Sequence, residues 1–365
     1  MTLKIGTLFT GAGGADIGAI QAGLTPAWGI EYDADIANAA RPNLGDHIKT
    51  MNVLDANPAN FARVDVIHAS PPCPNFSAAK INAEETALDI ALAAKVAEFI
   101  GVLKPRFFTL ENVRDYAHSK SLKIIIAALH GCGYAVNSWV LNSADYGVPQ
   151  TRKRLIVVAR RDGIKPSKPE PTHAEAPTPL FDHRRQWVGW YEAIEDLIPT
   201  LPETQLAPWQ IARMPDILTR TMILAQGGYD NQIVSRNGNE SIFTITANNN
   251  QTQMKAVLVT GMQNTARDAT ILAESQPFAL LVDKTGNVTT RCAGEPAPTI
   301  TASYFRHTLS ATIETKTVSI TPQCLARFQS FQNYIWPINQ SLAVKMIGNA
   351  VPPLLYAAVA KSFKS

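Results

Sequence analysis

Cysteine, charge and long apolar runs are all scarce in this chain. Its four cysteines, Cys73, Cys132, Cys292 and Cys324, are scattered and form no C-x-x-C pair, which argues against a disulfide framework and a zinc site. No apolar run reaches about 18 residues, the length that spans a membrane. The start of the chain lacks the apolar stretch and cleavage site of a signal peptide. The expectation is a cytoplasmic protein with reduced thiols, no metal and no membrane association.

The low content of charged residues says little about the type of molecule that the protein binds. Charged residues make up 17% of the chain and the formal net charge is +3, which is compatible with an anionic partner without requiring one. With 365 residues, 46% of them hydrophobic, the chain can bury a substantial core in one large or two ordinary domains.

Short apolar runs alternate with stretches of helical spacing up to about residue 161. This alternation favours an α/β fold with a mostly parallel sheet and helices on both faces. The expected strands are 3–9, 27–31, 64–69, 107–110 and 155–159, and the expected helices are 16–22, 33–38, 87–103 and 121–129.

The composition changes after Asp162. A proline-rich segment, 165–171, is typical of a linker, and a region rich in Thr, Asn and Gln with short β-like runs follows it. Within that region 244–247 is repeated as 299–302, which indicates either a duplicated β unit or two ordinary hairpins. The last stretch, 341–363, has helical spacing interrupted at 348–353.

Cys73 follows two prolines at the end of an expected strand, in the segment 70–77. Proline lacks the backbone N–H of a sheet ladder and fixes φ near about −65°, so the chain must leave the sheet in a stiff turn. Strand ends are where α/β proteins place their chemistry. By itself this placement leaves two interpretations equally open, a nucleophile and a buried inert thiol.

A glycine-rich turn, Gly11–Gly14, follows the first expected strand, and an acidic residue, Glu31, ends the second. Glycines let a ligand approach the N-terminus of the next helix, and a carboxylate at that strand end accepts hydrogen bonds from a ribose. Tyr32 could stack on an adenine. Because the turn is not a G-x-x-x-x-G-K-[ST] phosphate loop, a cofactor with a ribose and few or no phosphates fits better than ATP.

Two further groups carry charge toward strand ends. Glu111 is expected to end a strand and could act as an acid or base, although a helix cap or a surface acid is the plainer interpretation. Arg152 and Arg154 are two residues apart in an extended segment, so both can face one site with Lys153 on the other side. Their guanidinium groups suit phosphates or a carbonyl oxygen, and a solvated basic edge is the alternative.

The order of these segments closely resembles that of the DNA (cytosine-5)-methyltransferase family. The resemblance covers about residues 3–161 and 320–360. It is carried in order by 9–14, Pro71-Pro72-Cys73, Glu111-Asn112-Val113, 144–154 with its Gln150-x-Arg152-x-Arg154, 320–331 and 348–351.

The resemblance implies that S-adenosylmethionine donates a methyl group to carbon 5 of a cytosine flipped out of duplex DNA. It implies that Cys73 attacks carbon 6, that Glu111 hydrogen-bonds or protonates N3, and that Arg154 binds O2. Arg152 and Arg154 would favour the thiolate of Cys73.

The resemblance also implies a cofactor site and a nucleic-acid partner. The implied cofactor residues are Phe9, Gly11, Ala12, Gly13, Gly14, Glu31, Tyr32, Asn52, Val53, Pro71, Asn349 and Val351. Two positions depart from the family's common pattern, with Asn52 in place of an aspartate and Pro74 in place of a glutamine after the nucleophile. Candidate contacts to double-stranded DNA are Ser77, Asn248, Asn249, Gln251 and Arg306.

The implied organisation is a Rossmann-like catalytic domain over 1–165, a smaller β-rich target-recognition domain over 166–318, and a return to the catalytic domain over 319–365. A cognate restriction endonuclease is a possible partner, and a monomer is expected. The alternatives are a tRNA cytosine-5 methyltransferase, a non-catalytic DNA-binding regulator, and a thiol hydrolase, which would need a histidine beside Cys73 and has only His68 nearby.

Overall fold

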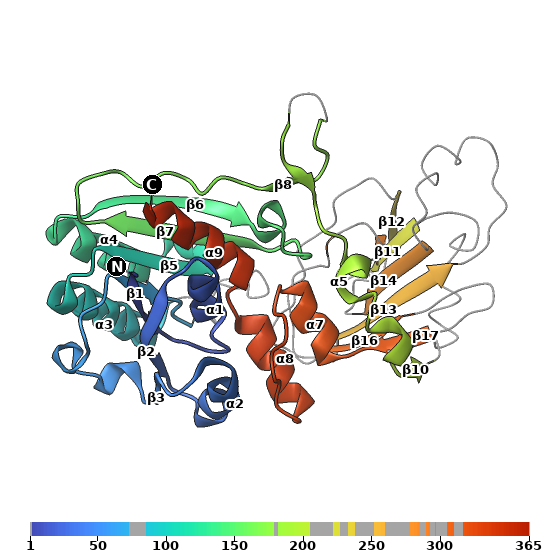
Figure 1. Cartoon of the computed structure of the whole chain (residues 1–365), viewed down its shortest axis with the longest axis horizontal. Helices are drawn as coiled ribbons and strands as arrows, with labels where there is room; N and C mark the ends of the chain where they lie inside the picture. Colours follow the sequence, from blue (N-terminus) through green and yellow to red (C-terminus); the bar gives the residue numbers. More distant parts are fainter. Residues whose placement is uncertain are drawn as a thin grey trace.

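A computed structural model describes residues 2–72, 85–178, 182–204, 222–226, 233–237, 252–259, 278–284, 290–292, 296, 305–309 and 317–364. Its centre is a seven-stranded sheet in the order β3-β2-β1-β4-β5-β7-β6 (Figure 1). The strands are β1 Lys4–Leu8, β2 Thr25–Glu31, β3 Ile48–Thr50, β4 Val66–Ala69, β5 Phe107–Val113, β6 Ala135–Asn142 and β7 Lys153–Arg160. The first five in this order are parallel, and β7 is antiparallel to both of its neighbours. The expected mostly parallel sheet is confirmed.

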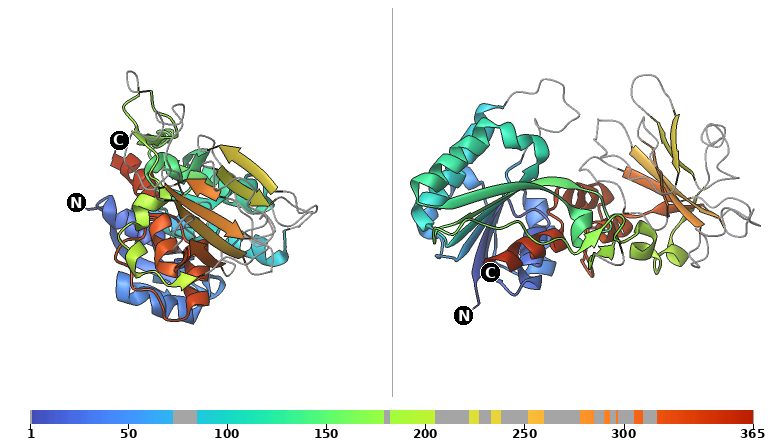
Figure 2. Two further views of the ribbon diagram at one scale, coloured as in Figure 1. Left: turned by 90° about the vertical axis from the view of Figure 1, so that its right-hand side faces the viewer. Right: turned by 90° about the horizontal axis from the view of Figure 1, so that it is seen from above.

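Helices cover both faces of this sheet (Figure 2). The described helices are α1 Gly14–Gln21, α2 Ala34–Leu44, α3 Ala87–Leu103, α4 Lys120–Gly131, α5 Trp190–Ile194, α7 Pro322–Phe328, α8 Gln340–Asn349 and α9 Pro353–Lys361. The bounds expected for α3 are confirmed, and its start is fixed by a capping box between Thr86 and Asp89. The expectation for α2 was too short, because that helix continues through Pro42 to Leu44.

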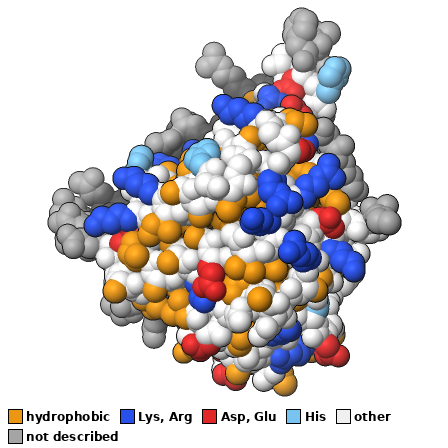
Figure 3. Space-filling view, turned by 90° about the vertical axis from the view of Figure 1, so that its left-hand side faces the viewer, with side chains coloured by type: hydrophobic (Ala, Val, Ile, Leu, Met, Phe, Trp, Pro, Cys, Tyr) orange, Lys and Arg blue, Asp and Glu red, His pale blue; other side chains and the backbone are white. Residues whose placement is uncertain are grey.

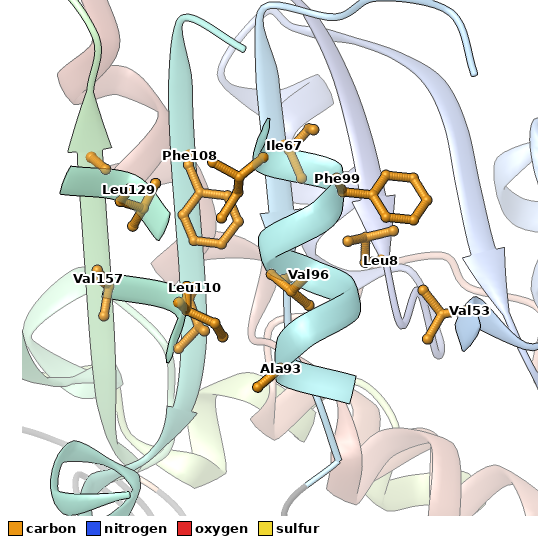
Figure 4. Close-up of a cluster of buried hydrophobic side chains, with 14 of the residues drawn as sticks. Leu8, Val53, Ile67, Ala93, Val96, Phe99, Phe108, Leu110, Leu129 and Val157 are labelled. Carbon is orange, nitrogen blue, oxygen red and sulfur yellow. The ribbon is translucent and has the colours of Figure 1, made fainter. Parts of the chain in front are cut away.

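The core on one face lies between the strands and α3 and α4 (Figure 4). Leu8, Ile67, Phe108 and Leu110 from the strands meet Ala93, Val96 and Phe99 of α3 and Leu129 of α4. A parallel sheet covered on both faces needs such apolar strands, and burying each large side chain contributes roughly 1.5–3 kcal/mol.

The opposite face is covered by α1 and α9, which come from the two ends of the chain and pack at very short range. A Cβ added to Gly14 would lie 1.9 Å from the Val351 carbonyl oxygen, and one added to Gly18 would lie 2.4 Å from that of Pro353. Only glycine fits at these two points. The C-terminal helix is therefore an integral layer of the first sheet.

A second sheet lies apart from the first in Figure 1. Its order is β10-β17-β16-β13-β14-β15, with β10 Glu203–Thr204, β13 Thr252–Val259, β14 Phe278–Lys284, β15 Thr290–Cys292, β16 Phe305–Leu309 and β17 Thr317–Ile320. Two strand pairs complete the described sheets, β11 Met222–Gln226 with β12 Ile233–Asn237, and β8 His173–Ala174 with β9 Arg185–Gln186. That these strands form a separate target-recognition domain stays a prediction. The repeated segments 244–247 and 299–302 lie outside the described residues.

The segment after residue 166 contacts the residues between β6 and β7 and the helices beside the first sheet. The Tyr146 hydroxyl donates to the Pro169 carbonyl oxygen at 3.0 Å, and the Trp187 indole donates to the Asp145 carboxylate at 3.0 Å. Trp190 of α5 is fully buried in one cluster with residues of α7 and α8. The chain thus crosses to the second sheet only after α5.

One described stretch, Gln340–Lys361, is long and apolar enough by composition to cross a membrane. It consists of two helices, α8 and α9, which the extended residues Ala350 and Pro352 separate. Most of it is buried in the protein, as is typical of core helices.

A glycine-to-alanine substitution should have opposite effects at Gly18, in the tight contact between α1 and α9, and at Gly101, which faces open space. Gly18→Ala should lower the free energy of unfolding by about 1–3 kcal/mol, because the new methyl group overpacks a backbone contact. Gly101→Ala in α3, where an added Cβ meets nothing within 4 Å, should raise it by about 0.5–1 kcal/mol. Urea denaturation of both variants measures the difference, and a neutral Gly18→Ala would contradict the tight contact.

Candidate active site

The glycine turn after β1 reaches the N-terminus of α1 through a run of left-handed backbone. Phe9, Gly11 and Gly13 have φ values of 64°, 57° and 73°. The Gly13 N–H donates to the Thr10 carbonyl oxygen at 2.8 Å, which closes the turn. Phe9 adopts a conformation that an aromatic residue rarely takes, and such strain is concentrated at functional sites.

Glu31 lies at the end of β2, beside this turn. Its two carboxylate oxygens accept the backbone N–H groups of Gly11 at 2.8 Å and Asp33 at 2.9 Å. The carboxylate therefore fixes the glycine turn, and each oxygen keeps a lone pair for a further hydrogen bond. The next residue, Tyr32, is 74% exposed, so the face of its ring is accessible.

Asn52 and Val53 begin a short 3-10 helix, Val53–Asp55. The Asn52 side-chain oxygen caps this helix by accepting the Leu54 N–H at 3.0 Å. The capping uses one lone pair of the amide oxygen and leaves the amide N–H₂ group for a ligand. Val53 is buried in the core beside α3.

The turn after β4 is bound from both sides. The Ser70 hydroxyl donates to the Phe9 carbonyl oxygen at 3.2 Å, and the Asn112 amide donates to the Pro71 carbonyl oxygen at 3.1 Å. Pro71 is buried. Cys73 and Ser77, the expected nucleophile and one expected DNA contact, lie outside the described residues.

Glu111 and Arg154 form a buried ion pair between β5 and β7. The Arg154 Nε atom lies 3.2 Å from the Glu111 Oε1 atom. Burial raises the pKa of the Glu111 carboxyl, and the positive charges of Arg154 and Arg152 oppose this only in part. Glu111 was expected at a strand end, and this was wrong, because β5 continues to Val113.

Arg152 shares the buried face of this segment but also contacts the other end of the chain. Its Nη2 atom donates to the carbonyl oxygens of Gly348 at 3.0 Å and Ala350 at 3.3 Å. The sequence correctly placed Arg152 and Arg154 on one face, away from exposed Lys153. It did not reveal that Arg152 holds the turn between α8 and α9.

That turn brings Val351, one of the two C-terminal cofactor candidates, to the glycine turn. Val351 is buried, and its carbonyl oxygen adjoins Gly14. Asn349 ends α8 and is exposed. The structure therefore gathers Gly13, Gly14 and Val351 in one region, as their assignment to one pocket requires.

Of the expected DNA contacts in the middle region, only Arg306 is among the described residues. Asn248, Asn249 and Gln251 lie outside the described residues. Arg306 belongs to β16, where its backbone is in register with Gln253 of β13.

Three polar residues next to the expected ones were missed as site residues. Ser70 and Asn112 bind the turn before Cys73. Gln150 is fully buried, and within the described part of the chain neither its amide nitrogen nor its amide oxygen has a hydrogen-bond partner. The signal for Gln150 was its place in the Gln150-x-Arg152-x-Arg154 motif, where a spacing of two residues can put it on the same face as both arginines.

The site's donor set fits an adenosine-type ligand. The exposed Tyr32 ring and the spare lone pairs of Glu31 match an adenine and a ribose. Among the described residues there is no cluster of three His, Cys, Asp or Glu side chains that could hold a metal ion.

His68 does not have the environment of a general base. Its Nδ1 atom lies 2.9 Å from the Thr109 hydroxyl, which contacts the Tyr356 hydroxyl of α9 at 3.1 Å. Burial lowers the pKa of His68 to about 3, and its Nε2 atom has no hydrogen-bond partner among the residues that the structure describes. This disfavours the thiol-hydrolase alternative.

The chain matches the family of C-5 cytosine-specific DNA methylases over residues 3–365. It belongs to this family and is therefore a DNA (cytosine-5)-methyltransferase, an enzyme that requires a methyl donor and DNA.

Bacterial type II methyltransferases are among its relatives. The chain is 33% identical to M.AquIA of Picosynechococcus over 226 residues, which are 55% of this chain and 90% of the relative. It is 27% identical to M.NgoPII of Neisseria gonorrhoeae over 380 residues, which are 99% and 95% of the two chains. With M1.HphI of Haemophilus parahaemolyticus the identity is 36%, over 48% of this chain and 50% of the relative.

Solved structures share the fold over the whole chain. A DNA modification methyltransferase encoded within an E. coli prophage aligns with a TM-score of 0.61 and 17% identity, covering 100% and 99% of the two chains. DNMT2 of Spodoptera frugiperda aligns with a TM-score of 0.59 and 14% identity over 100% of both chains.

The buried His68 predicts a component of acid sensitivity. Its folded-state pKa of about 3 lies below the ordinary 6.5, so the unfolded chain binds a proton first and stability falls as the pH drops from 6.5 toward 3. His68→Gln should remove about 2 kcal/mol of the loss in unfolding free energy between pH 7 and pH 5. Exposed His183→Gln is the control. Parallel pH profiles for the wild type and His68→Gln would refute this assignment.

Proposed function

We propose that the protein transfers a methyl group from S-adenosylmethionine to carbon 5 of a cytosine flipped out of duplex DNA, through a covalent bond between Cys73 and carbon 6. The observation that carries the proposal is the buried pair of Glu111 and Arg154 on strands beside the turn that leads to Cys73. A buried carboxyl with a raised pKa, next to a fixed guanidinium group, suits a pyrimidine that must be both protonated and bound through oxygen.

The proposed chemistry assigns one task to each group. The Cys73 thiolate adds to carbon 6 while Glu111 donates a hydrogen bond or a proton to N3, which makes carbon 5 nucleophilic. Arg154 binds O2 of the base. When bound, S-adenosylmethionine would supply the methyl group to carbon 5 and would leave as S-adenosylhomocysteine as its S–CH3 bond breaks. A base then removes the proton from carbon 5, any proton on N3 returns to Glu111, the double bond re-forms, and the thiolate leaves.

The methyl donor is proposed to lie at the glycine turn. Phe9, Gly11, Ala12, Gly13 and Gly14 would line it, Glu31 would bind the ribose, and Tyr32 would stack on the adenine. Asn52, Val53, Pro71, Asn349 and Val351 would complete the pocket. The contact between Gly14 and Val351 supports this arrangement, because it brings both ends of the chain to the turn.

The second sheet is proposed to belong to the target-recognition domain. Contacts that tie the segment before residue 202 to the first sheet's surroundings support a start of this domain near β10 rather than at residue 166. On the face turned away from the second sheet, Lys and Arg side chains are spread among apolar and acidic ones (Figure 3). Since DNA affinity depends on gathered positive charge, that face offers no reason to place the DNA there.

The proposed enzyme would have a role in bacterial DNA modification. The enzyme would methylate a specific DNA sequence, as part of a restriction-modification system with a cognate endonuclease or as an orphan methylase. It would act in the cytoplasm as a monomer. Transfer to tRNA is the second candidate reaction that an experiment must separate.

Incubation with labelled S-adenosylmethionine tests the reaction directly. Duplex DNA should yield 5-methylcytosine, and bisulfite sequencing of DNA from expressing cells should reveal the recognition sequence. Cys73→Ser should reduce transfer by at least about 1,000-fold, because a hydroxyl is a far weaker nucleophile at neutral pH, while cofactor affinity stays unchanged. Label found only on tRNA would overturn the DNA assignment, and full activity of Cys73→Ser would remove Cys73 from its role.

A further inference from the structure

The turn between β4 and the position of Cys73 has little backbone support of its own. Pro71 and Pro72 have no N–H group, so neither can donate a backbone hydrogen bond. The Ser70 N–H makes a long bond of 3.4 Å to the Leu8 carbonyl oxygen. The prolines stiffen the turn internally, but its position relative to the neighbouring strands must come from side chains.

Ser70 supplies a contact on the side of β1. Its hydroxyl donates to the Phe9 carbonyl oxygen at 3.2 Å. Phe9 is itself held at a φ of 64° at the entrance to the glycine turn. The Ser70 hydroxyl therefore links the Pro71–Pro72 turn to Phe9, which lies just before the glycine turn.

Asn112 supplies the contact on the side of β5. It is buried, and its amide donates to the Pro71 carbonyl oxygen at 3.1 Å while its side-chain oxygen accepts the Val113 N–H at 2.8 Å. The second bond fixes the rotamer, so the amide has one direction in which to donate. Because Asn112 follows Glu111 on the same strand, it relates the position of the turn to that of the catalytic carboxyl.

We propose that Ser70 and Asn112 are positioning residues that together fix the Pro71–Pro72 turn, and through it Cys73, relative to the cofactor turn and Glu111. This inference rests on the proposed nucleophilic role of Cys73. Attack on carbon 6 demands a near-attack geometry, and a misplacement of about 1 Å costs on the order of 100-fold in rate. Loss of either contact therefore slows covalent attack more than it weakens binding.

The chain contains a matched control for Asn112. Asn137 donates its amide to the Pro166 carbonyl oxygen at 3.1 Å and accepts the N–H of the following residue, Ser138, at 3.0 Å. This repeats the geometry of Asn112 at a site in β6 that touches no proposed catalytic group. Asn137→Ala therefore removes the same type of interaction without disturbing the turn.

The test uses the full-length enzyme, S-adenosylmethionine and a duplex carrying 5-fluorocytosine at the bisulfite-determined site. A base cannot remove fluorine from carbon 5 as it removes a proton, so the covalent adduct accumulates. The rate of adduct formation is measured on denaturing gels. Ser70→Ala and Asn112→Ala should each slow adduct formation by about 10-fold or more, with cofactor and DNA affinities within about twofold. Ser70→Thr, which keeps the hydroxyl, should stay within about threefold of the wild type.

The control separates positioning from general stability. Asn137→Ala should form the adduct at close to the wild-type rate even where its melting temperature falls as far as that of Asn112→Ala. Unchanged rates in both turn variants, or an equal loss in Asn137→Ala, would overturn the positioning role. A wild-type enzyme that forms no adduct would instead refute the proposed function itself.

Discussion

The site depends on two buried guanidinium groups that are given different partners. Arg154 pairs with Glu111, whereas Arg152 directs its Nη2 atom to the carbonyl oxygens of Gly348 and Ala350. Burial of the Glu111 carboxyl outweighs the attraction of both guanidinium charges, so the pKa of Glu111 rises. A raised pKa makes the Glu111 carboxyl easier to protonate, which favours the proposed activation of N3.

The same contact joins the two ends of the chain. Arg152 holds the turn between α8 and α9, and that turn presses its Val351 carbonyl oxygen against Gly14 of α1. Direct contacts therefore hold together the glycine turn, the segment that carries Arg152 and Arg154, and the helices α8 and α9. A hydrogen bond to a charged group contributes about 1.5–3 kcal/mol, so Arg152 is important for stability as well as for the chemistry.

The sequence predicted the elements whose signals are local. The helix over 87–103 was predicted with correct bounds, because its apolar spacing and the Thr86–Asp89 capping box act within one helix. The strand over 135–142 was missed, since most of its residues are only partly buried and it shows no clean alternation. The helix over 34–44 was predicted only for 33–38, and it continues through Pro42 to Leu44.

Side-chain partners were harder to predict than elements. The order of motifs placed Glu111 and Arg154 in one site, and the structure brings them within 3.2 Å. Nothing in the sequence indicated that Arg152 binds carbonyl oxygens 196 and 198 residues away, or that Asn112 binds Pro71. Such contacts depend on how distant segments pack, which periodicity and spacing do not encode.

The most direct measurement of the central claim is the titration of Glu111 by NMR. In protein carrying ¹³C at the glutamate carboxyl carbons, the Glu111 signal is identified as the one missing from Glu111→Gln. Its midpoint should lie above the ordinary glutamate pKa of about 4.3, because burial disfavours the charged form more than Arg154 and Arg152 favour it. A midpoint at or below the ordinary value would show that burial does not outweigh the two guanidinium charges.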